Sequence, residues 1–144
     1  MNKITIGKKD NNINYAFRET CFGIVEINNI FYITLKNNDY SLIGGGLDDS
    51  ESHYECLKRE FREEAGLIIK DIKELCTIDC YWHTRSNIDM NSLSNIYIVD
   101  ITSEELPPLE KESKLIKCTK EELLNSIVLP YQKEALKEYF KYKG

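Results

Sequence analysis

The sequence has no apolar run that approaches the ~20 consecutive residues needed to cross a membrane as a helix. It has no surplus of basic residues either, since 19 lysines and arginines face 24 aspartates and glutamates and leave a formal net charge of −5. A protein that coats nucleic acid would carry a basic surface, so this charge argues against that class. The segment after Met1 is polar and lacks the apolar core of a secretory signal. We therefore expect a protein that contacts neither membranes nor nucleic acid.

Histidine is scarce, with two residues, and the five cysteines are odd in number and scattered. Cys76 and Cys80 are separated by three residues, but no second pair and no histidine cluster completes a zinc site. Reduced thiols in a cytoplasmic protein are therefore the expected state. The chain also lacks repeats, low-complexity tracts and linkers, and its length suits one domain. We expect residues 1–144 to form a single domain.

Short apolar and β-branched stretches alternate with polar turns along most of the chain, which predicts many strands. The expected strands span residues 3–6, 15–27, 30–35, 40–43, 67–72, 73–83, 94–101 and 113–118, with loops at 84–93 and 102–111. Tight turns are expected at Asn28-Asn29 and at Asn37-Asn38-Asp39, because asparagine tolerates the positive φ that hairpins need.

Three helices are expected, and each has a start signal in the sequence. The first begins near His53, the second runs from Lys120 to about Ser126 after a Thr119 cap, and the third begins at Pro130. Strands on both sides of a central helix, followed by further helices, predict an α/β protein in which a mixed sheet lies between helices.

The helix that begins near His53 has the clearest pattern in the chain. Ser52 and Glu55 form an S-x-x-E capping box, and Gly66 is a natural left-handed stop after Ala65. One arc of this helix is apolar and should be buried; it consists of Tyr54, Leu57, Phe61 and Ala65.

Three glutamates, Glu60, Glu63 and Glu64, lie beside this apolar arc at the i, i+3, i+4 spacing that makes side chains neighbours. Like charges at this spacing destabilise a helix, and carboxylate oxygens suit hard divalent cations. Gly44, Gly45 and Gly46 are expected to form a loop before the helix, and they let the backbone approach a ligand or a metal closely. A glutamate-rich helix can equally be a solvated face, so the three glutamates alone do not decide the matter.

The spacing of a larger set of residues does decide it. The chain matches G-x5-E-x7-R-E-U-x-E-E-x-G-U, where U is apolar, with Gly45, Glu51, Arg59, Glu60, Phe61, Glu63, Glu64, Gly66 and Leu67. This stretch resembles the Nudix box, and the chain resembles the MutT-like Nudix hydrolases. A chance match at seven fixed positions is improbable, given the average abundance of each residue type.

The resemblance implies an α/β/α sandwich that covers essentially the whole chain. It also implies hydrolysis of a nucleoside diphosphate linked to another moiety, with Mg²⁺ as the cofactor and Mn²⁺ as a possible substitute. The implied metal ligands are the Gly44 carbonyl and the side chains of Glu60, Glu63 and Glu64. Arg59 and Glu51 would be a pair that orients these carboxylates.

Some relatives use a further glutamate on a later loop as a base or an extra ligand. The candidates here are Glu104, Glu105, Glu110 and Glu112. Glu112 and Glu110 lie just before the expected strand at residues 113–118, and we select Glu112. Simple solvated charge is the competing interpretation for each of them.

The substrate-binding residues have weaker signals. Trp82 could stack on a base, although a tryptophan is more often part of the core, and Arg18 or Arg85 could hold a phosphate or a base edge. His83 as a general base and Tyr131-Gln132 as pocket residues are further options.

Two classes of function remain open at this point. The first is a metal-dependent pyrophosphohydrolase that acts on a small nucleotide, with a nucleoside triphosphate as the first choice and a nucleotide sugar or dinucleoside polyphosphate as others. The second is a Nudix-fold nucleotide-binding or sensor module without turnover, although such modules usually lose box glutamates. An isomerase of the isopentenyl diphosphate type is a distant third. The protein is expected to be a monomer or a homodimer.

Overall fold

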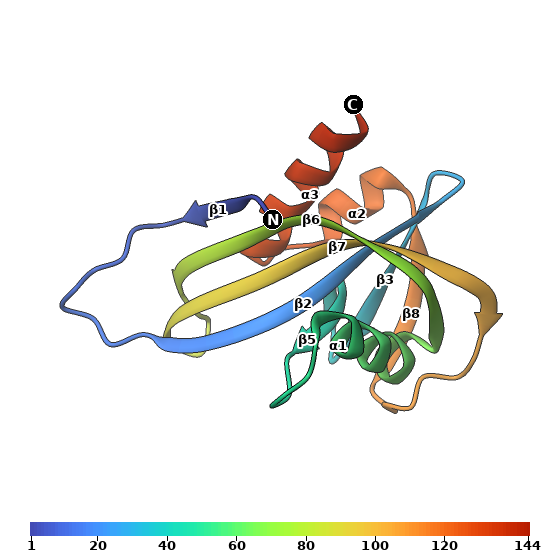
Figure 1. Ribbon diagram of the computed structural model, residues 1–144, viewed down its shortest axis with the longest axis horizontal. Helices are drawn as coiled ribbons and strands as arrows, with labels where there is room; N and C mark the ends of the chain where they lie inside the picture. Colours follow the sequence, from blue (N-terminus) through green and yellow to red (C-terminus); the bar gives the residue numbers. More distant parts are fainter.

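The alternation of side chains along β2 (Ala16–Ile27) explains why the sheet has helices on both faces. Phe22 and Ile24 point into one apolar cluster, whereas Cys21 and Val25 point into another on the opposite face. Because successive side chains of a strand point to opposite faces, the continuous apolar run at residues 21–25 must be covered on both faces. The computed structural model, which describes residues 1–144, shows the expected arrangement of helices on both faces of a mixed sheet (Figure 1).

The remaining strands and the helices follow in chain order. The strands are β1 (Lys3–Ile6), β3 (Ile30–Lys36), β4 (Asp39–Ser41), β5 (Ile43–Gly46), β6 (Leu67–His83), β7 (Asp89–Glu105) and β8 (Ser113–Cys118). The helical segments are α1 (His53–Glu60), η1 (Phe61–Ala65), α2 (Lys120–Ser126) and α3 (Pro130–Lys143). The main path of the sheet is β1-β6-β7-β2-β3-β4, with β5 paired to β2 and β8 paired to β3. None of the helices is both long and apolar enough to span a membrane.

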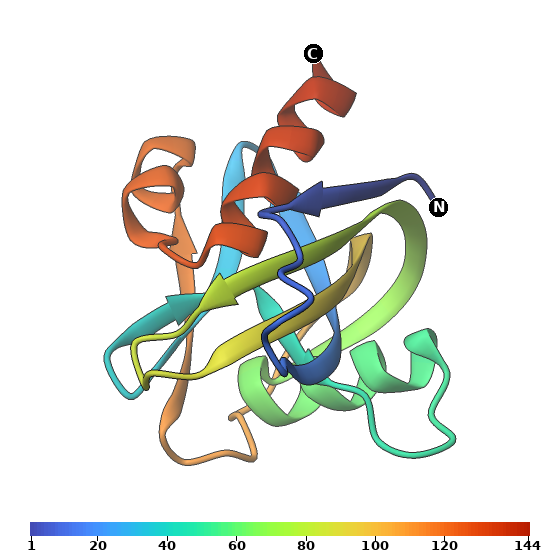
Figure 2. The same ribbon diagram turned by 90° about the vertical axis from the view of Figure 1, so that its left-hand side faces the viewer.

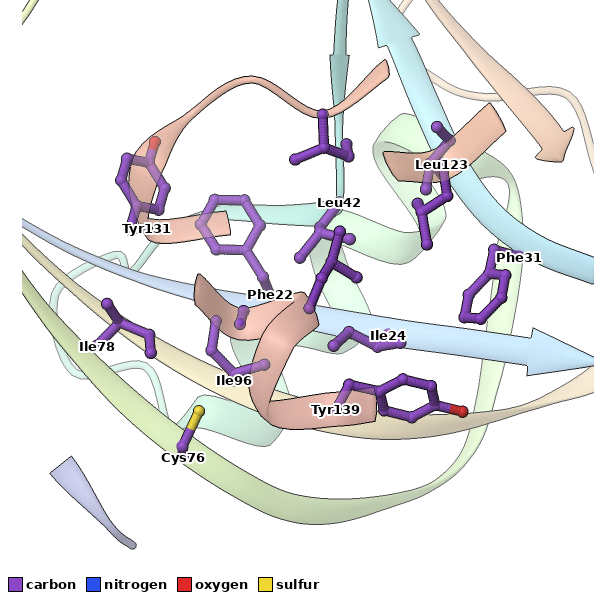
Figure 3. Packing of buried hydrophobic residues seen from close by; sticks show 14 of the residues in the cluster. Phe22, Ile24, Phe31, Leu42, Cys76, Ile78, Ile96, Leu123, Tyr131 and Tyr139 are labelled. Atoms are coloured by element: carbon purple, nitrogen blue, oxygen red, sulfur yellow. The ribbon is translucent and has the colours of Figure 1, made fainter. Parts of the chain in front are cut away.

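The helices α2 and α3 cover one face of the sheet, on the side where the chain ends (Figure 2). Beneath them lies the larger apolar cluster, in which side chains from β2, β3, β6 and β7 meet those of α3 (Figure 3). Its fully buried members include Ile24, Ile78, Ile96 and Leu136. Thr119 caps α2 with a complete capping box, and Pro130 is the first residue of α3, as expected from the sequence.

The segment α1–η1 covers the other face. Leu57, Phe61 and Ala65 are fully buried, as the expected apolar arc requires. Tyr54 is not part of this core, because its side chain remains 42% exposed at the first turn of the helix. Cys56 is buried instead, with its Sγ 3.7 Å from the Gly45 carbonyl and 3.6 Å from that of Gly46.

Local predictions of turns are confirmed. Asn28, Asn29, Asn37 and Asn38 all have positive φ, and they connect β2 to β3 and β3 to β4. The expected glycine loop is wrong, because Gly44, Gly45 and Gly46 form part of β5 and pair with β2. The expected strand at residues 40–43 is correspondingly two short strands, β4 and β5.

The largest departure from the sequence prediction is a long hairpin. The strands expected at 67–72 and 73–83 are one strand, β6, with irregular pairing at three points. Its partner β7 extends from Asp89 to Glu105, and so includes parts of both expected loops, 84–93 and 102–111. Polar residues such as Asn91 and Ser92 are strand residues here because they pair with Tyr81 and Cys80 across the hairpin. Cross-strand pairing therefore overrides the local preference of this polar segment.

Candidate active site

The caps of the α1–η1 segment fix where its carboxylates lie. Ser52 and Glu55 make both hydrogen bonds of the expected capping box. At the other end the helix widens into a π turn, in which the Gly66 N–H donates to the Phe61 carbonyl. Gly66 has φ of 68°, and a Cβ there would lie 1.7 Å from the Leu106 carbonyl oxygen, so only glycine fits. Single π turns inside α-helices are often found at functional sites.

Arg59 connects the loop before the helix to the glutamates on it. Its Nε and Nη2 donate to the two carboxylate oxygens of Glu51 at 2.7 and 2.9 Å. Its Nη2 also donates to the Gly46 carbonyl at 3.0 Å, and its Nη1 donates to Glu60 at 2.8 Å. The hydrogen bonds from Arg59 lower the pKa of Glu51 to about 2, so this carboxylate is charged. Arg59 and Glu51 therefore do form a pair, and the pair reaches the helix carboxylates.

Glu60 and Glu64 are the two buried carboxylates of this cluster, each only 8% exposed. Burial raises the pKa of Glu60 in spite of the hydrogen bond from Arg59. Burial also raises the pKa of Glu64 to about 7, and the neighbouring charge of Glu60 adds to the effect. The Gly44 N–H donates to Glu64 Oε1 at 3.3 Å, which places the glycine strand directly against this carboxylate. Two buried acids that repel one another favour a cation beside them.

Gly45 makes room for this cluster. A Cβ at this position would lie 2.8 Å from both Cδ and Oε1 of Glu60. Glu63 is only half-buried, and its carboxylate lies 3.4 Å from Nη1 of Arg59. The first glycine of the motif is thus required by the approach of one of the motif's own glutamates.

The loop between β7 and β8 supplies a further carboxylate. Glu110 is half-buried, and its Oε2 accepts a hydrogen bond from Lys36 Nζ at 2.6 Å. Lys36 Nζ also lies 3.7 Å from Glu64. Glu112, selected from the sequence, is exposed, and no hydrogen bond or ion pair holds it. Among the late glutamates, the geometry favours Glu110 over Glu112, because the loop turns Glu110 toward the cluster.

A hollow of about 270 Å³ opens beside these carboxylates. Its lining comes from β2, β3, β4, β5, the helical turn and the start of α3, and includes Arg18, Lys36, Asp39, Gly44, Gly45, Glu64, Tyr131 and Gln132. A larger hollow, about 700 Å³, lies between α2 and α3, but it is lined by four lysines and four apolar residues and contains no carboxylate. The smaller hollow is the one that combines acidic, basic and aromatic groups.

The expected substrate residues differ in their position relative to this hollow. Arg18 lines it, as do Tyr131 and Gln132. Trp82 does not line it, because its Nε1 donates to Ser92 at 3.0 Å and its ring packs against Tyr131 with centroids 5.8 Å apart.

Arg85 is exposed and pairs with Asp39 at 3.2 Å, so it approaches the hollow only through that residue. His83 is held in the β6–β7 turn by Asp89 and Asn87 and does not line the hollow, and the hydrogen bond to Asp89 raises its pKa.

Comparison with protein families decides the assignment. The model of the NUDIX domain matches residues 32–140, which include the glycine strand, the α1–η1 segment and most of α3. The chain belongs to the Nudix family. It is a Nudix hydrolase, an enzyme that acts on phosphorus-containing anhydrides.

Solved structures of Nudix proteins share the fold. A NUDIX hydrolase from Nitrosomonas europaea is 15% identical, with a TM-score of 0.75 over 88% of this chain and 90% of its own. A mutator MutT protein from Bacillus halodurans is 21% identical, with a TM-score of 0.69 over 83% and 80%. The NUDIX domain of NrtR from Shewanella oneidensis, solved in complex with ADP-ribose, is 12% identical, with a TM-score of 0.73 over 94% of each chain. None of the curated proteins compared with the chain gives a significant match.

The side chains at the site of this Nudix hydrolase offer carboxylate oxygens, which are the ligand atoms that hard divalent cations prefer. Four carboxylates, those of Glu60, Glu63, Glu64 and Glu110, offer oxygen ligands, and burial disfavours the charged forms of Glu60 and Glu64 by raising the pKa of each. No three of these side chains converge as tightly as a bound ion would draw them. Their oxygens turn instead to Arg59 and Lys36.

Lys36 and Asp39 are site residues that the sequence analysis missed. Both lie beside the Asn37-Asn38 turn, where a strand of the sheet ends at the hollow. The sequence signal that could have identified them is a charged residue on each side of a tight turn. Charged residues are common beside exposed hairpin turns, so this signal does not single out a functional site.

Proposed function

We propose that this Nudix hydrolase is a metal-dependent pyrophosphohydrolase that cleaves a nucleoside diphosphate linked to a further group, with a nucleoside triphosphate as its substrate. The observation that carries the proposal is the pair of buried carboxylates, Glu60 and Glu64, beside the glycine strand and a hollow that also contains Arg18. Buried like charges are costly for a fold, so their presence at a hollow points to a function in the site.

Glu60, Glu63 and Glu64 would hold the metal, together with the carbonyl of Gly44. Mg²⁺ is the proposed ion, because it prefers carboxylate and carbonyl oxygens, and Mn²⁺ accepts the same donors. A bound divalent ion would neutralise diphosphate oxygens and lower the pKa of a water molecule.

The other charged residues have separate roles in this proposal. Arg59, held by Glu51, orients the carboxylate of Glu60. Arg18 faces the hollow and neutralises phosphate oxygens of the substrate. Glu110 takes the place of Glu112, for which the roles of base and extra ligand were both open, and we assign it the role of base, in which a carboxylate oxygen accepts a proton from the attacking water.

The aromatic residue proposed to contact the base is Tyr131 rather than Trp82. Tyr131 lines the hollow, and Trp82 supports it from behind through their edge-to-face contact. Aromatic faces stack on any base, so this contact would bind a nucleotide without selecting among bases.

A hydrolysis assay across a nucleotide panel tests the proposal. Purified protein is incubated with Mg²⁺ or Mn²⁺ and with nucleoside triphosphates, nucleotide sugars, dinucleoside polyphosphates and ADP-ribose, and the products are separated by chromatography. ADP-ribose belongs in the panel because the Shewanella NrtR domain was solved with it. The expected result with a triphosphate is metal-dependent formation of one nucleoside monophosphate and one pyrophosphate, with one water consumed.

The Glu64→Gln variant is the control for contaminating phosphatases. Tight nucleotide binding without turnover of any compound in the panel would contradict the proposal and would favour a sensor module.

A further inference from the structure

Lys36 occupies an unusual position for a basic residue, because it lies among the carboxylates that would hold the metal. It is the last residue of β3, and its side chain is about two-thirds buried, with 35% exposed. Its Nζ lies 2.6 Å from Glu110 Oε2 and 3.7 Å from Glu64 Oε2. The ammonium group therefore bridges two carboxylates that come from different elements.

The two elements are attached to one another independently of Lys36. The Glu110 N–H donates to the Glu63 carbonyl at 2.9 Å, and Ser113 Oγ donates to the Glu64 carbonyl at 2.6 Å. These hydrogen bonds hold the loop between β7 and β8 against the π turn of the motif helix. The position of the Glu110 backbone thus does not depend on the ammonium group, which can leave without releasing the loop.

The charges around the cluster show what Lys36 contributes. Only Arg59 and Lys36 lie within ion-pair distance of Glu60, Glu63, Glu64 or Glu110. Arg59 is fixed by two hydrogen bonds to Glu51 and one to the Gly46 carbonyl. Lys36 makes one contact with Glu110 and one with Glu64, both through the Nζ atom at the end of a flexible four-carbon chain. Lysine is therefore the cation of this site that is free to move.

We propose that Lys36 is an internal counter-ion of the active site: its ammonium group neutralises Glu64 and Glu110 in the metal-free enzyme, and a divalent metal ion must displace it in order to bind. The inference rests on the proposed function, because it assumes that Glu64 is a metal ligand. An ammonium group less than 4 Å from a ligand oxygen repels an incoming dication strongly, since water cannot screen charges well in a half-buried site. Displacement also frees Glu110 for its own role.

Metal titration without nucleotide tests this inference. Mn²⁺ binding is measured by calorimetry and by electron paramagnetic resonance for the wild type, Lys36→Met and Lys36→Arg. Lys36→Met removes the competing charge and keeps the length of the chain, so its Mn²⁺ affinity is expected to rise by about tenfold. Lys36→Arg keeps the charge, so its affinity is expected to stay within about threefold of the wild type.

Lys137→Met is the matched control, because Lys137 also pairs with a glutamate but lies on α3, outside the site. It makes the same change in net charge, and its Mn²⁺ affinity is expected to equal that of the wild type. Circular dichroism establishes that each variant is folded, and Lys36→Gln serves as a second neutral variant.

Unchanged or weaker Mn²⁺ binding in the folded neutral variants would overturn the inference and leave the proposed function standing. Absence of Mn²⁺ binding in every variant, together with metal-independent hydrolysis, would overturn the proposed function as well.

Discussion

Arg59 and Glu51 lie eight residues apart and form a two-point ion pair, in which Nε and Nη2 each donate to a different carboxylate oxygen. The pair ties the loop before α1 to the penultimate residue of that helix. Its remaining nitrogen, Nη1, reaches Glu60 and Glu63. The guanidinium group of Arg59 is thus held in place by Glu51, and it in turn positions the carboxylates of Glu60 and Glu63.

We predict that Arg59→Lys lowers kcat by about 10- to 100-fold, as is typical when a partner of a metal ligand is lost. Lysine keeps the charge but cannot make the forked contact, so the carboxylate of Glu60 loses its orientation. The measurement is steady-state kinetics with Mg²⁺, alongside a thermal scan to show that the fold persists. Lys58→Arg, at the neighbouring exposed position, is the control and should match the wild type. Wild-type kcat in Arg59→Lys would show that the pair has no positioning role.

We predict that Glu63→Gln and Glu64→Gln each reduce turnover by more than ~100-fold, since a lost ligand should cost more than a lost supporting partner. Both substitutions keep the size of the side chain, so the fold should remain intact. Glu55→Gln is the control on the same helix, because Glu55 contacts only the capping box. Equal activity of the wild type and both variants would refute the assignment of metal ligands.

The local parts of this site could be predicted from the sequence, because their partners lie within one helical segment and its flanks. The capping box of Ser52 and Glu55, the left-handed Gly66 and the pair of Arg59 with Glu51 all span eight residues or fewer. Their geometry follows from helical periodicity and from the few residues that can end a helix.

The contacts that cross the sheet could not be predicted in this way. Lys36 and Glu110 are 74 residues apart, and they meet because β3 and β8 pair in a register that places Lys36 opposite Ser113. Register is a property of paired strands, and a periodic pattern in one strand does not specify it. Glu112 is selected from the sequence rather than Glu110 for the same reason: the turn before β8 decides which glutamate faces the cluster, and the local sequence pattern does not specify that turn.

The pKa of Glu64 predicts how the metal-free protein depends on pH. Burial raises this pKa from 4.5 to about 7, so the folded state binds a proton more readily than the unfolded state does. The stability due to the protonated carboxyl is full below about pH 4.5 and is lost as the pH rises through about 7. In EDTA at pH 8, Glu64→Gln should therefore raise the free energy of unfolding by an amount on the order of 1–3 kcal/mol, and Tm should rise with it. At pH 4 the substitution should change Tm little. Thermal scans at the two pH values measure the difference, and an equal Tm shift at both would contradict it.

Arg18 and Arg85 allow a test of the substrate-binding surface. Arg18 lines the hollow beside Glu64, whereas Arg85 is an exposed partner of Asp39. Arg18→Gln should raise KM by about tenfold or more, because a charged hydrogen bond to phosphate is worth roughly 1.5–3 kcal/mol. Arg85→Gln should change KM by less than about threefold, since exposed ion pairs contribute little. The reverse order of effects in steady-state kinetics would move the phosphate site away from the hollow.

The two glycines Gly45 and Gly46 provide the sharpest steric test. A Cβ at Gly45 would lie 2.8 Å from the carboxylate carbon of Glu60, whereas a Cβ at Gly46 would lie 3.6 Å from Arg18, an ordinary contact. In Gly45→Ala the end of the Glu60 side chain must shift, so we expect weaker Mg²⁺ binding and a kcat reduced by about 10- to 100-fold, with Tm lowered by only a few degrees. Gly46→Ala should keep both values near those of the wild type. Kinetics over a range of Mg²⁺ concentrations separates the two variants. Equal kcat in both would mean that the position of the Glu60 carboxylate is not critical for catalysis, and the close approach of β5 to the motif helix would then serve packing alone.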